Sequence, residues 1–220
     1  MQINNKIIFG FPIMNTKINK NSYDKKNIVS TIEKNFKINN KRNNWDKESL
    51  LHHSANDRNN LKYKKINFKS ILPVYKETIL SMLKKLNTIC NYSFEFDISN
   101  YTCLSNNNFM KPHIHADCHF TAVHYLQFDK KNHKGTRFIN TLPFTDYIKE
   151  IAPGLYNVLS LNDNKNSWLC ESWIDNVEED DFYFYPAYLK HTIDPQVAKN
   201  KNRITIVLNI KLLKEIKNVH

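Results

Sequence analysis

A short segment rich in metal-binding side chains is the strongest chemical signal in the sequence. Residues 113–119 read HIHADCH and so contain three histidines, one aspartate and one cysteine. If this segment enters a strand, His115 and Asp117 point to the same face, because side chains alternate along a strand. One further histidine from a distant strand would complete a set of two imidazoles and one carboxylate, and His191 is the candidate.

Such a set has a specific chemistry. Two histidines and one carboxylate bind iron(II) on one face, and three positions stay open for a bidentate co-substrate and oxygen. Arg203 follows His191 by twelve residues and opens an apolar segment. A guanidinium beside a metal binds a dicarboxylate through two parallel hydrogen bonds. Thr205 faces the same way if this segment is a strand, and it would add a hydroxyl donor.

The elements that would position these residues are mostly strands. From residue 93 onward apolar and polar residues alternate, as Phe94, Phe96 and Ile98 do, and turn-prone runs interrupt the pattern. The apolar residues between Ile7 and Ile13 add a candidate strand near the N-terminus. The main predicted strands are 93–104, 118–127, 136–140, 154–161, 167–174, 181–186 and 203–212.

Two helices are predicted before these strands. The apolar residues between Leu72 and Leu86 fall on one helical face, and Ser70 offers a start signal, so we place a helix at 71–90. A second amphipathic helix is indicated at 28–36. Helices beside several short strands predict a mainly β fold with helical support (α+β), such as a sandwich or jelly roll.

Blocks at five places in the sequence resemble the iron(II)/2-oxoglutarate-dependent oxygenases of the prolyl-hydroxylase type. The resemblance is closest to members from bacteria and phages, and it covers residues 90–212. It implies a double-stranded β-helix, a jelly-roll and cupin-like core, at 91–213. Residues 1–90 would form an extension with supporting helices, within a single domain spanning 1–220. The blocks are His113–His115, Thr121–Leu126, Gly135–Phe138, Phe184–His191 and Arg203–Asn209.

The resemblance also implies roles for single residues and for cofactors. The cofactors would be iron(II) and 2-oxoglutarate, with ascorbate as a further candidate. Many relatives have H-x-H-P-G where this chain has His113-Ile-His115-Ala-Asp117, so a metal set with His113 stays open. The implied iron ligands are His115, Asp117 and His191, and the implied co-substrate residues are Arg203, Tyr125, Thr205 and Tyr101.

The expected activity is that of a dioxygenase that hydroxylates a substrate the sequence does not identify. A protein side chain such as prolyl is the leading expectation, and a nucleobase or a small molecule is the alternative. One rival function is a cupin-like metalloprotein without 2-oxoglutarate, but cupins need a glutamate soon after H-x-H, and none follows before Glu150. The other rival is a non-catalytic jelly-roll binding or structural protein.

Composition limits the remaining classes. The net charge of +11 and the pI near 9.4 suggest a nucleic-acid partner, but 28 lysines and 32 asparagines together are typical of AT-rich coding. Only three glycines occur and no phosphate-binding loop motif is present. The four cysteines form no C-x-x-C pair, and no signal peptide or membrane span is recognisable. We therefore expect a cytoplasmic protein, in the host cytoplasm if the gene is viral, with no membrane partner. The sequence leaves its oligomeric state open.

Overall fold

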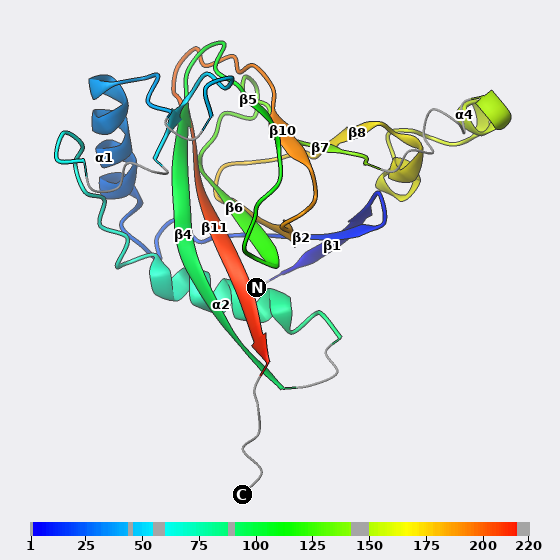
Figure 1. Cartoon of the computed structure of the whole chain (residues 1–220), viewed down its shortest axis with the longest axis horizontal. Helices are drawn as coiled ribbons and strands as arrows, with labels where there is room; N and C mark the ends of the chain where they lie inside the picture. The colour runs from blue at the N-terminus through cyan, green and yellow to red at the C-terminus, as the bar shows by residue number, and fades with distance from the viewer. Residues whose placement is uncertain (1, 44–45, 55–59, 88–90, 142–149, 215–220) are drawn as a thin grey trace, which may run out of the picture.

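Two antiparallel sheets form the body of the protein in a computed structural model, which describes residues 2–43, 46–54, 60–87, 91–141 and 150–214 (Figure 1). These sheets confirm the predicted mainly β fold with helical support. In spatial order the seven-stranded sheet contains β1 (Asn4–Ile8), β2 (Phe11–Lys17), β9 (Asp181–Pro186), β6 (Phe120–Gln127), β11 (Arg203–Lys214), β4 (Tyr92–Leu104) and β3 (His52–His53). The four-stranded sheet contains β5 (Met110–His113), β10 (His191–Ile193), β7 (Thr136–Ile139) and β8 (Ser172–Ile174).

The core lies on both faces of the large sheet, because its central strands are buried on both sides. Ile204 and Ile206 of β11 belong to the hydrophobic cluster under the helices. Val207 belongs with Tyr125 and Phe138 to a second cluster, which joins β6 and β11 to β7 of the small sheet. The small sheet therefore packs over one face of the large sheet, and the helices cover the other.

Helix α2 (Leu72–Leu83) confirms the predicted helix but is shorter than the range 71–90. Its buried side chains include Tyr75, Ile79 and Met82, which pack in the same hydrophobic cluster as Ile204 and Ile206, between the helices and the large sheet. Ser70 does not cap the helix, because the N-cap position belongs to Ile71, and the Ser70 Oγ accepts a hydrogen bond from the Asp24 amide. Residues 88–90 of the predicted helix lie outside the described residues. Helix α1 (Lys25–Ile38) includes the range predicted at 28–36.

Two of the strands predicted after residue 93 differ from the structure. The range 154–161 begins with the short helix α4 (Gly154–Val158), and Leu155, Val158 and Leu159 do in fact recur at helical spacing. The range 167–174 contains the end of a 3₁₀ helix, η1 (Asn164–Leu169), and only then β8. Strands β5 and β10 were not predicted, because four and three residues are too few to show an alternating pattern.

The N-terminal segment extends the large sheet. The candidate strand between Ile7 and Ile13 is instead a hairpin of β1 and β2, and its turn residues Phe9 and Gly10 have φ values of 53° and 84°. Such left-handed values at both positions suit the twist of a tight hairpin. Strand β2 then pairs with β9 from Met14 to Lys17. The boundary placed at residue 90 stays a prediction.

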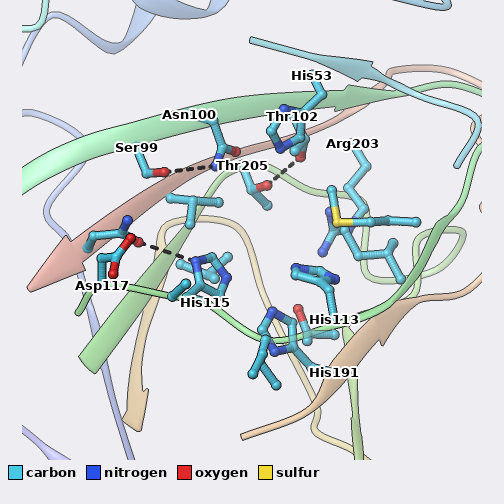
Figure 2. Close-up of a pocket in the computed structure, with 18 residues that line it drawn as sticks. His53, Ser99, Asn100, Thr102, His113, His115, Asp117, His191, Arg203 and Thr205 are labelled. Atoms are coloured by element: carbon cyan, nitrogen blue, oxygen red, sulfur yellow. Dashed lines mark hydrogen bonds between the residues drawn. The ribbon is translucent and has the colours of Figure 1, made fainter. Parts of the chain in front are cut away.

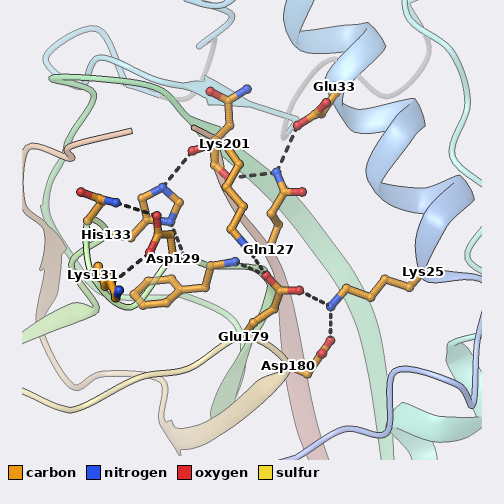
Figure 3. A network of polar contacts seen from close by, with 12 residues as sticks. Lys25, Glu33, Gln127, Asp129, Lys131, His133, Glu179, Asp180 and Lys201 are labelled. Atoms are coloured by element: carbon orange, nitrogen blue, oxygen red, sulfur yellow. Dashed lines mark hydrogen bonds and ion pairs between the residues drawn. The ribbon is translucent and has the colours of Figure 1, made fainter. Parts of the chain in front are cut away.

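A network of charged side chains joins α1 to the segments before β9 and β11 (Figure 3). Glu179 accepts hydrogen bonds from Lys25 at 2.9 Å, from Lys201 at 2.5 Å and from the Phe128 amide at 3.0 Å. Burial acts to raise the pKa of Glu179, but these donors outweigh it and the pKa is lowered. Lys201 lies two residues before Arg203, so the network helps to fix the start of β11.

Other sequence expectations concern cysteines and membranes. Cys103, Cys118 and Cys170 are free thiols, whereas Cys90 lies outside the described residues. Among the described helices, none has both the length and the apolar character that a membrane crossing requires.

The contact between α2 and the large sheet yields a stability prediction. The Tyr75 side chain is fully buried, and its hydroxyl is 2.8 Å from Nδ1 of the buried His124. We expect Tyr75→Phe to lower the free energy of unfolding by about 1–3 kcal/mol, the usual cost of leaving a buried polar atom without its partner. Denaturant titration measures this value. Tyr188→Phe is the matched control, because Tyr188 is 60% exposed, and an equal loss in both variants would contradict the argument.

Candidate metal centre

Three histidines converge where β5 and β10 pair. His191 is the first residue of β10, and His113, the last residue of β5, is its cross-strand partner. His115 follows two residues after the end of β5. One nitrogen from each ring can be chosen so that all three lie within 4.8 Å of one another (Figure 2). The two strands are short and far apart in the sequence, so local patterns could not reveal that they pair.

Two of the three predicted ligands, His115 and His191, belong to this cluster, and the third member is His113 rather than Asp117. Asp117 lines the same cavity but lies outside the cluster. The prediction assumed a continuous strand, whereas β5 ends at His113 and Asp117 has a left-handed φ of 59°. The alternation that would have placed Asp117 beside His115 therefore does not apply. The structure groups the set with His113 that the sequence left open.

In each ring of the cluster Nδ1 lies beside an oxygen acceptor, and Nε2 of His191 also lies 3.5 Å from the Tyr185 hydroxyl. Nδ1 of His191 lies 2.8 Å from the Leu189 carbonyl, and Nδ1 of His113 lies 3.0 Å from the Lys111 carbonyl. Nδ1 of His115 lies 3.2 Å from Oδ1 of Asn209. When Nδ1 donates its proton to such an acceptor, Nε2 keeps the lone pair that binds a metal.

Burial keeps these rings in the form that binds metals. It lowers the pKa of His113, that of His115 to about 4, and that of His191 well below the usual range. His113 further lowers the pKa of His115 and of His191, because a second positive charge is unfavourable nearby. Neutral imidazoles with fixed Nδ1 atoms suit a divalent ion such as iron(II), so the donor set fits the metal that the sequence predicts.

A cavity of about 430 Å³ opens beside the cluster and contains a buried cation. The side chain of Arg203 is fully buried, and its Nε donates to the Lys134 carbonyl at 3.1 Å. Among the described residues, neither Nη1 nor Nη2 has a hydrogen-bond partner. Burial lowers the pKa of Arg203, and the neighbouring Tyr125 and Tyr185 offset only part of this effect. Buried guanidinium nitrogens without partners are rare, and an anionic ligand would satisfy them.

Of the other three predicted co-substrate residues, two lie at the cavity or beside Arg203 and one lies elsewhere. Thr205 lines the cavity, and its hydroxyl is 2.6 Å from that of Thr102. The Tyr125 ring lies 5.2 Å from the Arg203 guanidinium carbon, and its hydroxyl contacts Thr136. Tyr101 lies outside this cavity, because it points to the other face of β4, where its hydroxyl accepts a hydrogen bond from Asn35.

His53 is a cavity residue that the sequence did not predict. It lines the cavity from β3, which pairs with β4 so that His53 lies opposite Thr102. Burial, followed by the neighbouring His113 and His115, lowers the pKa of His53 to about 3. A two-residue strand has no periodic signal, so only the pair His52-His53 itself could have drawn attention to this position.

Comparison with known proteins adds a family and a fold. Residues 100–209, half of the chain, match the model of the family described as "Putative 2OG-Fe(II) oxygenase". The match contains all three clustered histidines and Arg203. No curated protein matches this chain.

Three solved structures match this chain at low sequence identity. A prolyl hydroxylase from Trichoplax adhaerens, in complex with a hypoxia inducible factor peptide fragment, is 11% identical with a TM-score of 0.50, covering 92% of this chain and 83% of its own. A 2OG-Fe(II) oxygenase family oxidoreductase from Burkholderia pseudomallei is 12% identical with a TM-score of 0.37, covering 62% and 58%. A Pseudomonas putida prolyl-4-hydroxylase is 13% identical with a TM-score of 0.38, covering 64% and 62%. This chain therefore spans less than two thirds of the length of the Burkholderia and Pseudomonas proteins. The likeness to the Trichoplax structure supports the double-stranded β-helix fold.

The geometry of the cluster predicts which side chains a metal needs. We expect His113→Ala to weaken binding of iron(II) or cobalt(II) on the order of 100-fold, because each ligand contributes a few kcal/mol. Asp117→Asn should leave metal affinity nearly unchanged, since Asp117 lies outside the cluster. Anaerobic calorimetric titration measures both affinities. An equal loss of metal affinity in the two variants would show that Asp117 is also a ligand.

Proposed function

Because this chain belongs to the 2OG-Fe(II) oxygenase family, we propose that it is an iron(II)- and 2-oxoglutarate-dependent dioxygenase that hydroxylates a protein side chain such as prolyl. The observation that carries the proposal is one cavity with a histidine cluster and a buried arginine, whose Nη atoms have no partner among the described residues. A cupin-like metalloprotein without 2-oxoglutarate would have no use for that cation.

His113, His115 and His191 would hold iron(II) in this proposal. The metal and its co-substrate supply the oxidising chemistry, in which 2-oxoglutarate and oxygen become succinate and carbon dioxide while a C–H bond is hydroxylated. The protein supplies position and surroundings. Nδ1 contacts fix the rings, and apolar side chains such as Met110, Val207 and Ile193 line the cavity and limit access of water.

Arg203 would bind the far carboxylate of 2-oxoglutarate. A dicarboxylate bound at the metal through one end must bury its other charge, and a buried charge needs a partner. Nη1 and Nη2 can donate two parallel hydrogen bonds to it. The hydroxyl of Thr205 would add a donor, and Tyr125 packs beside the guanidinium.

A peptide substrate is supported by analogy, since one solved relative is a prolyl hydroxylase with a bound peptide fragment. The net charge of +11 favours a nucleobase as the alternative, although the joint richness in lysine and asparagine is typical of AT-rich coding. Ascorbate stays a prediction.

Turnover of the co-substrate tests the proposed activity. We expect purified protein with iron(II) to convert 2-oxoglutarate to succinate slowly without a primary substrate, as measured by chromatography of the products. Omission of iron(II) and His191→Ala are the controls, and each should abolish the conversion. Succinate formation that persists in both controls would assign the activity to a contaminant.

The role of Arg203 yields a separate prediction. Arg203→Lys should weaken 2-oxoglutarate binding by roughly 2–5 kcal/mol, because an ammonium cannot reproduce the two parallel hydrogen bonds. Arg137→Lys is the matched control, since Arg137 pairs with Asp194 and does not line the cavity. Calorimetric titration of 2-oxoglutarate into cobalt-loaded protein gives both affinities. Unchanged binding in Arg203→Lys would remove the co-substrate assignment.

A further inference from the structure

A second buried polar group in the cavity has an atom without a partner. Asn100 of β4 is 7% exposed and lines the cavity. Its Nδ2 donates to Ser99 Oγ at 3.4 Å, whereas its Oδ1 has no hydrogen-bond partner among the described residues. A buried acceptor is normally satisfied, so this oxygen is available to a ligand that donates a hydrogen bond.

A β-bulge places Asn100 at this position. In the pairing of β4 with β11, Val207 lies opposite Asn100 and Leu208 lies opposite Ile98, so Ser99 is the additional residue. Ser99 and Asn100 both line the cavity, although neighbouring residues of a regular strand point to opposite faces. Bulges redirect side chains and are frequent beside active sites.

Asp117 adds a second acceptor on the same cavity. It is exposed, has a left-handed φ of 59°, and forms no ion pair in the described part of the chain. Figure 2 shows Asp117 and Arg203 on opposite sides of His115. Among the described residues that line the cavity, Asp117 is the one aspartate and Arg203 the one arginine. The two ends of the cavity therefore carry opposite charges.

We propose that Asn100 and Asp117 bind a primary ammonium or guanidinium group of the substrate. This inference rests on the proposed function, because it assigns the Arg203 end to 2-oxoglutarate and the Asp117 end to the substrate. An ionised carboxylate and an amide oxygen both accept hydrogen bonds, and a cationic nitrogen group donates several. A substrate held in this way would present a nearby carbon to the histidine cluster between the two ends.

Binding of matched peptides tests the inference. The probes are blocked tripeptides, acetyl-Gly-Xaa-Gly-amide, in which Xaa is lysine, arginine, norleucine or glutamate. Each is titrated into cobalt-loaded protein with saturating 2-oxoglutarate, at an ionic strength that screens the net charge of +11. We expect the lysine or arginine peptide to bind about fivefold more tightly than the norleucine peptide, in the range of an exposed ion pair.

Variants separate the two acceptors from general effects. Asp117→Asn should remove the preference for the cationic peptides, and Asn100→Leu should reduce it. Glu95→Gln removes one exposed carboxylate elsewhere on β4 and should keep the preference. Equal binding of the lysine and norleucine peptides, a preference that survives Asp117→Asn, or no binding of any probe would overturn the inference. If wild-type protein fails to bind 2-oxoglutarate, the proposed function fails and the inference fails with it.

Discussion

The antiparallel pairing of β10 with β5 is the constraint on which the site depends. Strand β10 has three residues and lies between β5 and β7, so its hydrogen bonds to both neighbours fix His191 opposite His113. His115 reaches the same point because the chain leaves β5 directly after His113. A displacement of β10 by one residue would turn His191 to the other face of the sheet.

The large sheet supplies the second half of the site. Arg203 and Thr205 lie two residues apart on β11, between β4 and β6, and so face the cavity together. The strand is buried on both faces, which allows it to carry a guanidinium into the interior. The histidine cluster and the arginine thus come from different sheets, and the packing of one sheet over the other brings them to one cavity.

The long elements and the arginine could be predicted from the sequence, but the third member of the histidine cluster could not. Strand β4 is long enough to show alternation and β11 to show an apolar run, and Arg203 was notable because arginine is rare in this chain. The choice between His113 and Asp117 depended on where β5 ends, and no periodic signal marks that point. His53 and the bulge at Ser99 depend on pairing between strands, which local patterns do not encode.

A crystal structure of the protein with iron(II) and 2-oxoglutarate, prepared without oxygen, tests the central claim most directly. We predict iron about 2.0–2.2 Å from a nitrogen of each of His113, His115 and His191, the usual range for imidazole ligands. We also predict the far carboxylate of 2-oxoglutarate on Nη1 and Nη2 of Arg203. Iron bound through Asp117 in place of His113, or a co-substrate that leaves Arg203 without a partner, would contradict it.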